Sequence, residues 1–100
     1  MFQSHVHQRP VRAQVYEEVI VDANGEGFVL LPPEVFKTEV VIEGGPIRML
    51  VTGDIPTPDF GVPGYDSDRV VLSPHEAARF LAVRTGATNA LLRATHFVLA

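Results

Sequence analysis

Cysteine is absent from the sequence, which therefore can form neither a disulfide framework nor a thiolate metal site. Basic residues are also scarce. Lysine occurs once, at Lys37, and the seven arginines are scattered along the chain. A nucleic-acid-binding face needs a stripe of basic side chains, so we expect no nucleic-acid partner.

Long apolar runs are missing as well. No run approaches the ~18 residues that a membrane-spanning helix requires, so we expect no membrane partner. The first residues, MFQSHVHQRP, contain no apolar stretch behind a basic region and do not resemble a signal peptide. These patterns predict a soluble protein that is made in a cytoplasm.

The common catalytic motifs are absent too. The sequence has no G-x-S-x-G, no glycine-rich phosphate loop and no cysteine–histidine pair. Its serines, Ser4, Ser67 and Ser73, have no evident triad partners beside them. We therefore expect a protein that is not an enzyme, with no catalytic residue and no cofactor.

What the chain does contain is typical of one folded domain. It has 100 residues, of which 46% are apolar and 20% charged, so a single compact core is feasible. Residues 1–13 are polar and mixed and predict an arm, which leaves residues 14–100 as a single β domain. Eight prolines and eight glycines predict many turns.

Strand patterns fill the first half of that domain. The stretch AQVYEEVIV favours strand, the Asn24-Gly25 pair is a turn signal, and Gly27 offers a second position for a positive φ. With FVLL as the return strand, this predicts a hairpin. Alternation over 38–43 puts Val40 and Ile42 on one face, and alternation over 47–52 puts Ile47, Met49 and Val51 on one face. The two segments predict a second hairpin around Gly44-Gly45-Pro46.

The second half mixes one helix signal with further strands. A short strand is expected at 68–73. Ser73, Pro74 and Glu76 then form a capping box that begins one or two helical turns, with Gly86 as a possible end. Strand over 80–85, with Leu81 and Val83 inward, is the alternative. Residues 89–100 predict a final strand pinned in a sheet.

The fold class expected from these elements is mainly β. Six to seven short strands at spacings near ten residues predict a small antiparallel β-sandwich or barrel, with one short helix near Pro74–Phe80 and a long loop rich in proline and glycine.

Histidines and carboxylates give few candidates for chemistry. His5 and His7 form an H-x-H pair that could share a metal, but they lie in the polar arm and a solvated role is expected. His75 is expected to be exposed beside Glu76, and His96 to be half-buried or at an interface. The aspartates at 54, 59, 66 and 68 are expected to hydrogen-bond their own backbone in turns, and no metal is expected.

The segment GDIPTPDFGVPG, residues 53–64, is long for a loop in a small domain, and such loops usually have a role. Its three prolines set φ and lower the entropy lost on docking. We interpret it as a semi-rigid arm that packs on its own domain or on a neighbour. The expected interface residues are His5, His7, Arg9, Ile55, Phe60, Val62 and Tyr65.

Two stretches, VVIEGGPIRMLVTGDIPTPDFG and VVLSPHEAARFLAVRTGATNALLRATHF, resemble small virion proteins of phages. The matching positions are Gly45, Arg48, Gly53, Pro56, Thr57, Gly61, Leu72, Phe80, Gly86 and Ala87. The resemblance implies a small β-sandwich in a virion, of the type that decorates or stabilises the head. Together with the small size, the polar arm and the proline-rich loop, it leads us to expect the major capsid protein or other virion proteins as partners and a homo-trimer as the assembly. It carries over no catalytic residue.

Three other functions stay open, one of which is a small enzyme or metal-dependent binding module built on a barrel. A component of the phage neck or tail is a variant of the virion-protein hypothesis. The stretch VDANGEGFVLLPPEVF is similar to small DNA-binding antitoxins or regulators of the swapped-hairpin kind, although DANGEG is acidic where such proteins face phosphate.

Overall fold

A computed structural model describes residues 11–23, 25–29 and 35–99 of the chain, and confirms the expected fold class. The described residues form seven strands in two antiparallel sheets and one short helix. In chain order the elements are β1 (Val11–Val21), β2 (Val35–Gly44), β3 (Ile47–Leu50), β4 (Val62–Gly64), β5 (Arg69–Leu72), α1 (Pro74–Ala77), β6 (Leu81–Arg84) and β7 (Ala90–Leu99). Strand β1 begins at Val11, so it includes the last three residues of the 1–13 stretch that was expected to be an arm; residues 1–10 lie outside the described residues.

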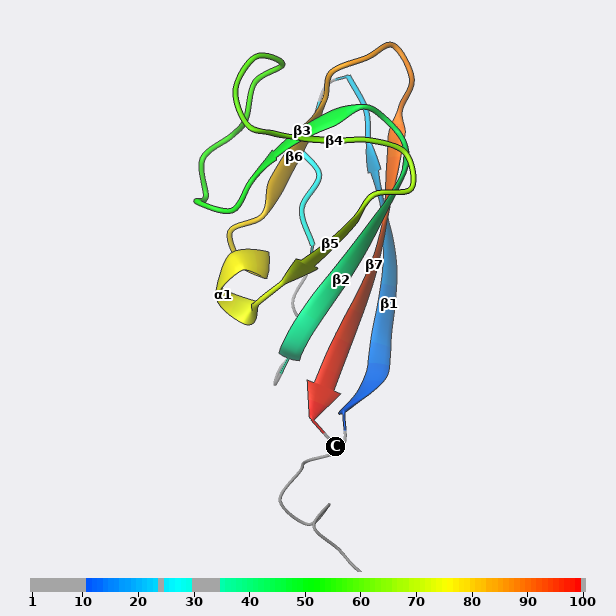
Figure 1. Cartoon of the computed structure of the whole chain (residues 1–100), viewed down its shortest axis with the longest axis vertical. Coiled ribbons are helices and arrows are strands. Elements are labelled where there is room, and N and C mark those ends of the chain that lie inside the picture. Colours follow the sequence, from blue (N-terminus) through cyan, green and yellow to red (C-terminus); the bar gives the residue numbers. More distant parts are fainter. Residues whose placement is uncertain (1–10, 24, 30–34, 100) are drawn as a thin grey trace, which may run out of the picture.

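The two sheets differ in size and length. The larger has the strand order β1-β7-β2-β5, and the smaller has the order β4-β3-β6. Long strands β1, β7 and β2 continue well past the smaller sheet, as Figure 1 shows. The final strand β7 lies between β1 and β2 and pairs with both along its length, which confirms that the C-terminal strand is pinned in a sheet.

Among the described residues, neither expected hairpin is present. Strand β1 pairs with β7, and Phe28 and Val29 lie outside any strand, while residues 30–31 are outside the described part of the chain. Strands β2 and β3 are adjacent in sequence but belong to different sheets. Gly44 and Gly45, with φ of 76° and 89°, and the cis bond before Pro46 carry the chain from one sheet to the other.

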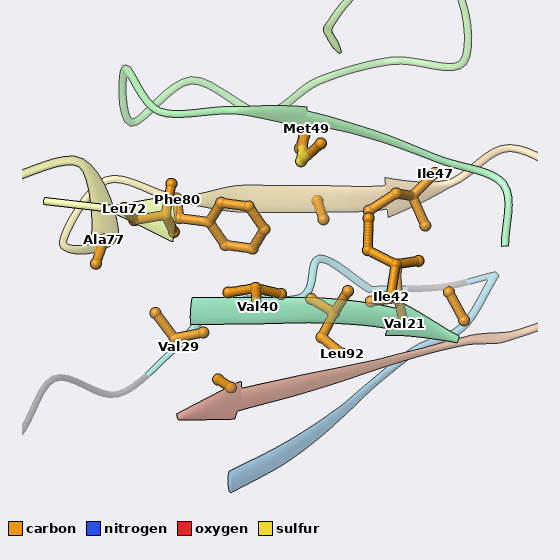
Figure 2. Close-up of a cluster of buried hydrophobic side chains, with 13 residues drawn as sticks. Val21, Val29, Val40, Ile42, Ile47, Met49, Leu72, Ala77, Phe80 and Leu92 are labelled. Atoms are coloured by element: carbon orange, nitrogen blue, oxygen red, sulfur yellow. The ribbon is translucent and has the colours of Figure 1, made fainter. Parts of the chain in front are cut away.

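The core lies between the inner faces of the two sheets. Side chains from β2 and β7 meet Ile47, Met49 and Ala82 of the smaller sheet, and Phe80 fills the space near α1 (Figure 2). The expected alternation is confirmed, since Val40 and Ile42 are fully buried. Burying each such side chain contributes roughly 1.5–3 kcal/mol, so the matched inner faces provide the main stabilisation of the sandwich.

The capping box of α1 is confirmed. Ser73 Oγ accepts from the Glu76 backbone N–H at 3.2 Å, and Glu76 Oε1 accepts from the Ser73 N–H at 2.9 Å. The helix ends at Ala77, within the short helix expected near Pro74–Phe80, and residues 81–84 form the alternative strand, which pairs with β3. Within that strand the inward residue is Ala82, so the expected inward positions of Leu81 and Val83 were wrong.

Candidate functional site

The segment from Gly53 to Tyr65, called the proline loop below, leaves β3, turns back and rises above the two sheets (Figure 1). Its last part is strand β4, in which Val62 and Gly64 pair with Met49 and Ile47. The stretch that was expected to be a loop therefore includes one short strand. Pro63 is tolerated because β4 is the edge strand of its sheet.

The tip of the proline loop is a tight turn. Thr57 and Phe60 exchange two backbone hydrogen bonds of 2.9 and 3.1 Å around Pro58 and Asp59. Proline favours the second position of such a turn because its ring sets φ near the required value. The Asp59 N–H also donates to Thr57 Oγ1 at 3.3 Å, so the tip has a defined conformation.

The base of the proline loop is held against the sandwich. Pro56 is buried, and Arg48 Nη1 donates to the carbonyl of Gly61 at 2.9 Å. Gly61 has a φ of 135°, and a Cβ there would lie 3.1 Å from Pro56 and 3.2 Å from Arg48. The Gly53 N–H donates to the carbonyl of Arg79 at 3.1 Å. These contacts support a semi-rigid loop packed on its own domain.

Four large apolar side chains of the proline loop are exposed. The exposed fractions are 57% for Ile55, 65% for Phe60, 59% for Val62 and 58% for Tyr65. They are four of the nine exposed large hydrophobics among the described residues, although the proline loop spans only residues 53–65. Single exposed apolar residues are ordinary, but a local concentration of them is typical of interaction surfaces.

Negative charge surrounds the same part of the molecule. Residues 53–76 contain five carboxylates and one arginine, a formal charge of −4, whereas the rest of the chain carries seven acidic and seven basic side chains. The net charge of the whole protein therefore resides in this segment. An apolar partner surface with basic residues around it would be complementary to this charge.

Of the turn aspartates, Asp68 has the expected local role, since the Tyr65 N–H donates to its Oδ2 at 2.8 Å. Asp66 instead accepts from the N–H of the distant Gly44 at 2.9 Å, and Asp54 accepts from the Thr52 hydroxyl at 3.2 Å. Nowhere in the described ranges do three or more histidine or acidic side chains gather as a metal site would need.

The histidines divide into three cases. His5 and His7, together with Arg9, lie outside the described residues, so their expected interface role stays a prediction. His75 is exposed in α1, as expected. His96 is fully buried, which corrects the expectation of a half-buried position.

His96 belongs to a row of polar side chains on the inner face of the larger sheet. Its Nδ1 lies 2.7 Å from Thr38 Oγ1, which is also fully buried, and its Nε2 lies 3.5 Å from Glu17 Oε2 without forming a hydrogen bond. Sequence reasoning missed this row. The spacing of two residues between Leu92, Ala94 and His96 could have placed His96 on the same inward face as the other two. Thr38 and His96 have no access to solvent, so the pair that they form is a structural feature of the core.

The outer face of the larger sheet carries a second polar network. Arg93 on β7 donates to Glu43 on β2 at 2.6 Å and to Glu18 and Tyr16 on β1 at 2.7 Å each. The pKa of the Arg93 guanidinium is raised above its usual value. The hydrogen bond to Glu43 is the largest cause, and the hydrogen bond to Tyr16 is the next largest. These groups bind one another across three strands and leave the proline loop as the better candidate for contacts with a partner.

Fold and site together define a two-sheet β-sandwich with an ordered, exposed apolar loop in an acidic segment. Comparison of the chain with protein-family models, with curated proteins and with solved structures found no match. Over the part of the chain that the structure describes, no helix is long and apolar enough to cross a membrane.

Proposed function

We propose that this chain is a structural virion protein of a phage, of the type that decorates and stabilises the capsid through contacts between subunits. The observation that carries the proposal is the exposure of Ile55, Phe60, Val62 and Tyr65 on a loop that is already ordered. The resemblance of the chain to phage virion proteins supports the same function.

The proline loop suits binding to a repeating surface. A specific interface of standard size buries ~1,600 Å² in total, and large apolar side chains supply much of its free energy. A loop whose path is set by hydrogen bonds and prolines loses little conformational entropy on docking. In a shell, many weak contacts act together, so a small subunit stabilises the particle by avidity.

The partners proposed are the major capsid protein or other virion proteins, with a homo-trimer as the assembly. Mass spectrometry and cryo-microscopy of purified particles test the proposal. Hundreds of copies per particle are expected for a capsid protein, whereas rings of six or twelve copies would place the chain at the neck or tail. Absence of the chain from particles would overturn the proposal.

A further inference from the structure

An apolar groove opens along one side of the sandwich, between β3 and β4 of the smaller sheet and β5 of the larger. Its volume is about 240 Å³. The groove is lined by Met49, Leu50, Val51, Thr52, Val62, Val70, Val71, Leu72 and Glu76. Val62 and Val71 are both more than half exposed, at 59% and 55%, so apolar surface on both sides of the groove faces solvent.

Both strands beside this groove have a free edge among the described residues, because β5 ends the larger sheet and β4 ends the smaller one. Next to β5, Ile42 exchanges backbone hydrogen bonds with Ser67 and Asp68. Bonded and non-bonded pairs alternate along antiparallel strands. Starting from Ile42, this alternation directs the N–H and C=O groups of Arg69 and Val71 away from β2, toward the free edge.

An unpaired edge of this kind is a template for one more strand. A strand paired with Arg69 and Val71 would turn alternate side chains into the groove, where they would cover the lining valines and leucines. The backbone of the strand would supply affinity, and its apolar side chains would supply specificity.

Charge distinguishes between the possible occupants. Glu76 lies in the groove lining, and Asp66 and Asp68 lie in the turn that leads into β5. The arginine of β5, Arg69, already has Glu39 at 3.8 Å, and Arg48 is bound to the carbonyl of Gly61. A second copy of the chain would bring the same negative charge to this segment, whereas a basic segment would be attracted to it.

We propose that the groove receives an extended apolar segment of a partner protein, flanked by basic residues, which adds a strand to the free edge of β5. This rests on the proposed function, since it names how a partner chain engages the face of the molecule that includes Val62.

The test uses the full chain labelled with ¹⁵N and an extended peptide of alternating valine and threonine with lysines at both ends. Amide shifts are expected at Arg69–Leu72 and around Met49 and Val62, and a matched peptide with glutamates in place of the lysines is expected to bind more weakly. Val71→Pro removes the N–H at the free edge, where proline is tolerated in a strand. Because one backbone hydrogen bond is lost, the variant is expected to bind the lysine peptide about tenfold more weakly.

Val71→Thr is the matched control, because it keeps the N–H and the preference for strand, and it is expected to bind like the original chain. If Val71→Pro does not fold, Val62→Lys replaces it, and its added cation is expected to weaken binding of the lysine peptide. Equal binding of both peptides, shifts confined to other regions, or full affinity in Val71→Pro would overturn the inference. So would self-association of the free chain that Val71→Pro abolishes, since the occupant would then be a second copy.

The peptide test and the particle test fail separately. A chain that is present in particles but binds neither peptide would overturn the groove inference and leave the proposed function in place. A chain that binds the lysine peptide but is absent from particles would overturn the proposed function.

Discussion

At the scale of single residues, Ser67 has a backbone conformation that usually belongs to glycine. Its φ is 72°, and it lies opposite Ile42 in a β-bulge that joins the turn at Tyr65 to strand β5. Bulges of this geometry favour glycine at this position, because a Cβ in the left-handed region contacts the following carbonyl oxygen. Ser67 is therefore a strained residue at the entry to the proposed edge strand.

We expect Ser67→Gly to raise the free energy of unfolding by about 0.5 kcal/mol. Relief of the left-handed strain is worth roughly 1–2 kcal/mol, and the extra entropy of glycine in the unfolded chain offsets roughly 0.5–1 kcal/mol of it. Urea unfolding followed by circular dichroism measures the difference. Ser67→Ala keeps the Cβ and should show no gain, whereas a Ser67→Gly variant less stable than the original chain would contradict the explanation.

Gly27 is a position that requires glycine, as the sequence indicated, but the reason differs from the expected one. The expected positive φ is not present, since the positive-φ glycines among the described residues are 44, 45, 53 and 61. Gly27 instead brings its backbone close to the core, where it exchanges hydrogen bonds of 2.8 and 2.9 Å with Ala82. A Cβ on Gly27 would lie 2.5 Å from Val21 Cγ2, so the space itself requires glycine.

At the scale of elements, this contact joins the connection after β1 to strand β6 of the smaller sheet. Gly27→Ala is expected to lower the free energy of unfolding by about 1–3 kcal/mol, because the buried Val21 side chain has little freedom to move. Thermal or urea unfolding measures the loss. Gly25→Ala is the matched control, since its Cβ would lie 3.7 Å from the nearest atom and should have a much smaller effect. Equal stability of the two variants would show that the approach of Gly27 is not constrained.

The strands also show the limit of periodicity at this scale. Alternation assigned the buried faces of β2 and β3 correctly, with Val40 and Ile42 in one and Ile47 and Met49 in the other. Alternation could not show which strands pair with β2 and β3, because a strand has the same alternation of buried and exposed residues whichever strand lies beside it. A two-residue turn has the same sequence signal whether it joins paired strands or strands of different sheets. At Gly44-Gly45 it joins strands of different sheets, so the signal wrongly indicated a hairpin.

At the scale of the whole molecule, the core and the exposed loop contain apolar residues with separate roles. Phe60 is 65% exposed and Phe80 is 2% exposed, so truncation of the two should affect different properties. We expect Phe60→Ala to change the free energy of unfolding by less than about 1 kcal/mol while weakening assembly onto particles. Occupancy of the chain on particles and urea unfolding of the free chain measure these effects.

Phe80→Ala provides the contrast for Phe60→Ala. It removes a fully buried ring and is expected to lower the free energy of unfolding by roughly 3–5 kcal/mol. If Phe60→Ala also unfolds the free chain and changes nothing else, the proline loop is part of the core packing and has no role in binding.

The path and the apolar composition of the proline loop were predictable from the sequence, because their signals are local, whereas its role as an interface stays a prediction. Prolines set φ wherever they occur, and the exposed Ile55, Phe60, Val62 and Tyr65 stand in a segment too rich in proline and glycine to form much regular structure. The groove beside β5 was not predictable, because it depends on Val62 and Val71 being brought together from two different sheets. The burial of His96 against Thr38 likewise depends on a pairing between distant strands.

By itself, the sequence determined the mainly β class, the buried faces of β2 and β3, the capping box at Ser73 and Glu76, and the apolar character of the proline loop. Each of these depends on residues within a few positions of one another, where propensity, period and capping act. Only the tertiary structure decided that β7 lies between β1 and β2, that β2 and β3 separate into two sheets, and that a groove remains open beside β5. The cost of closing a loop changes slowly with its length, so local signals hardly distinguish one pairing from another, and the packing of the whole core makes the choice.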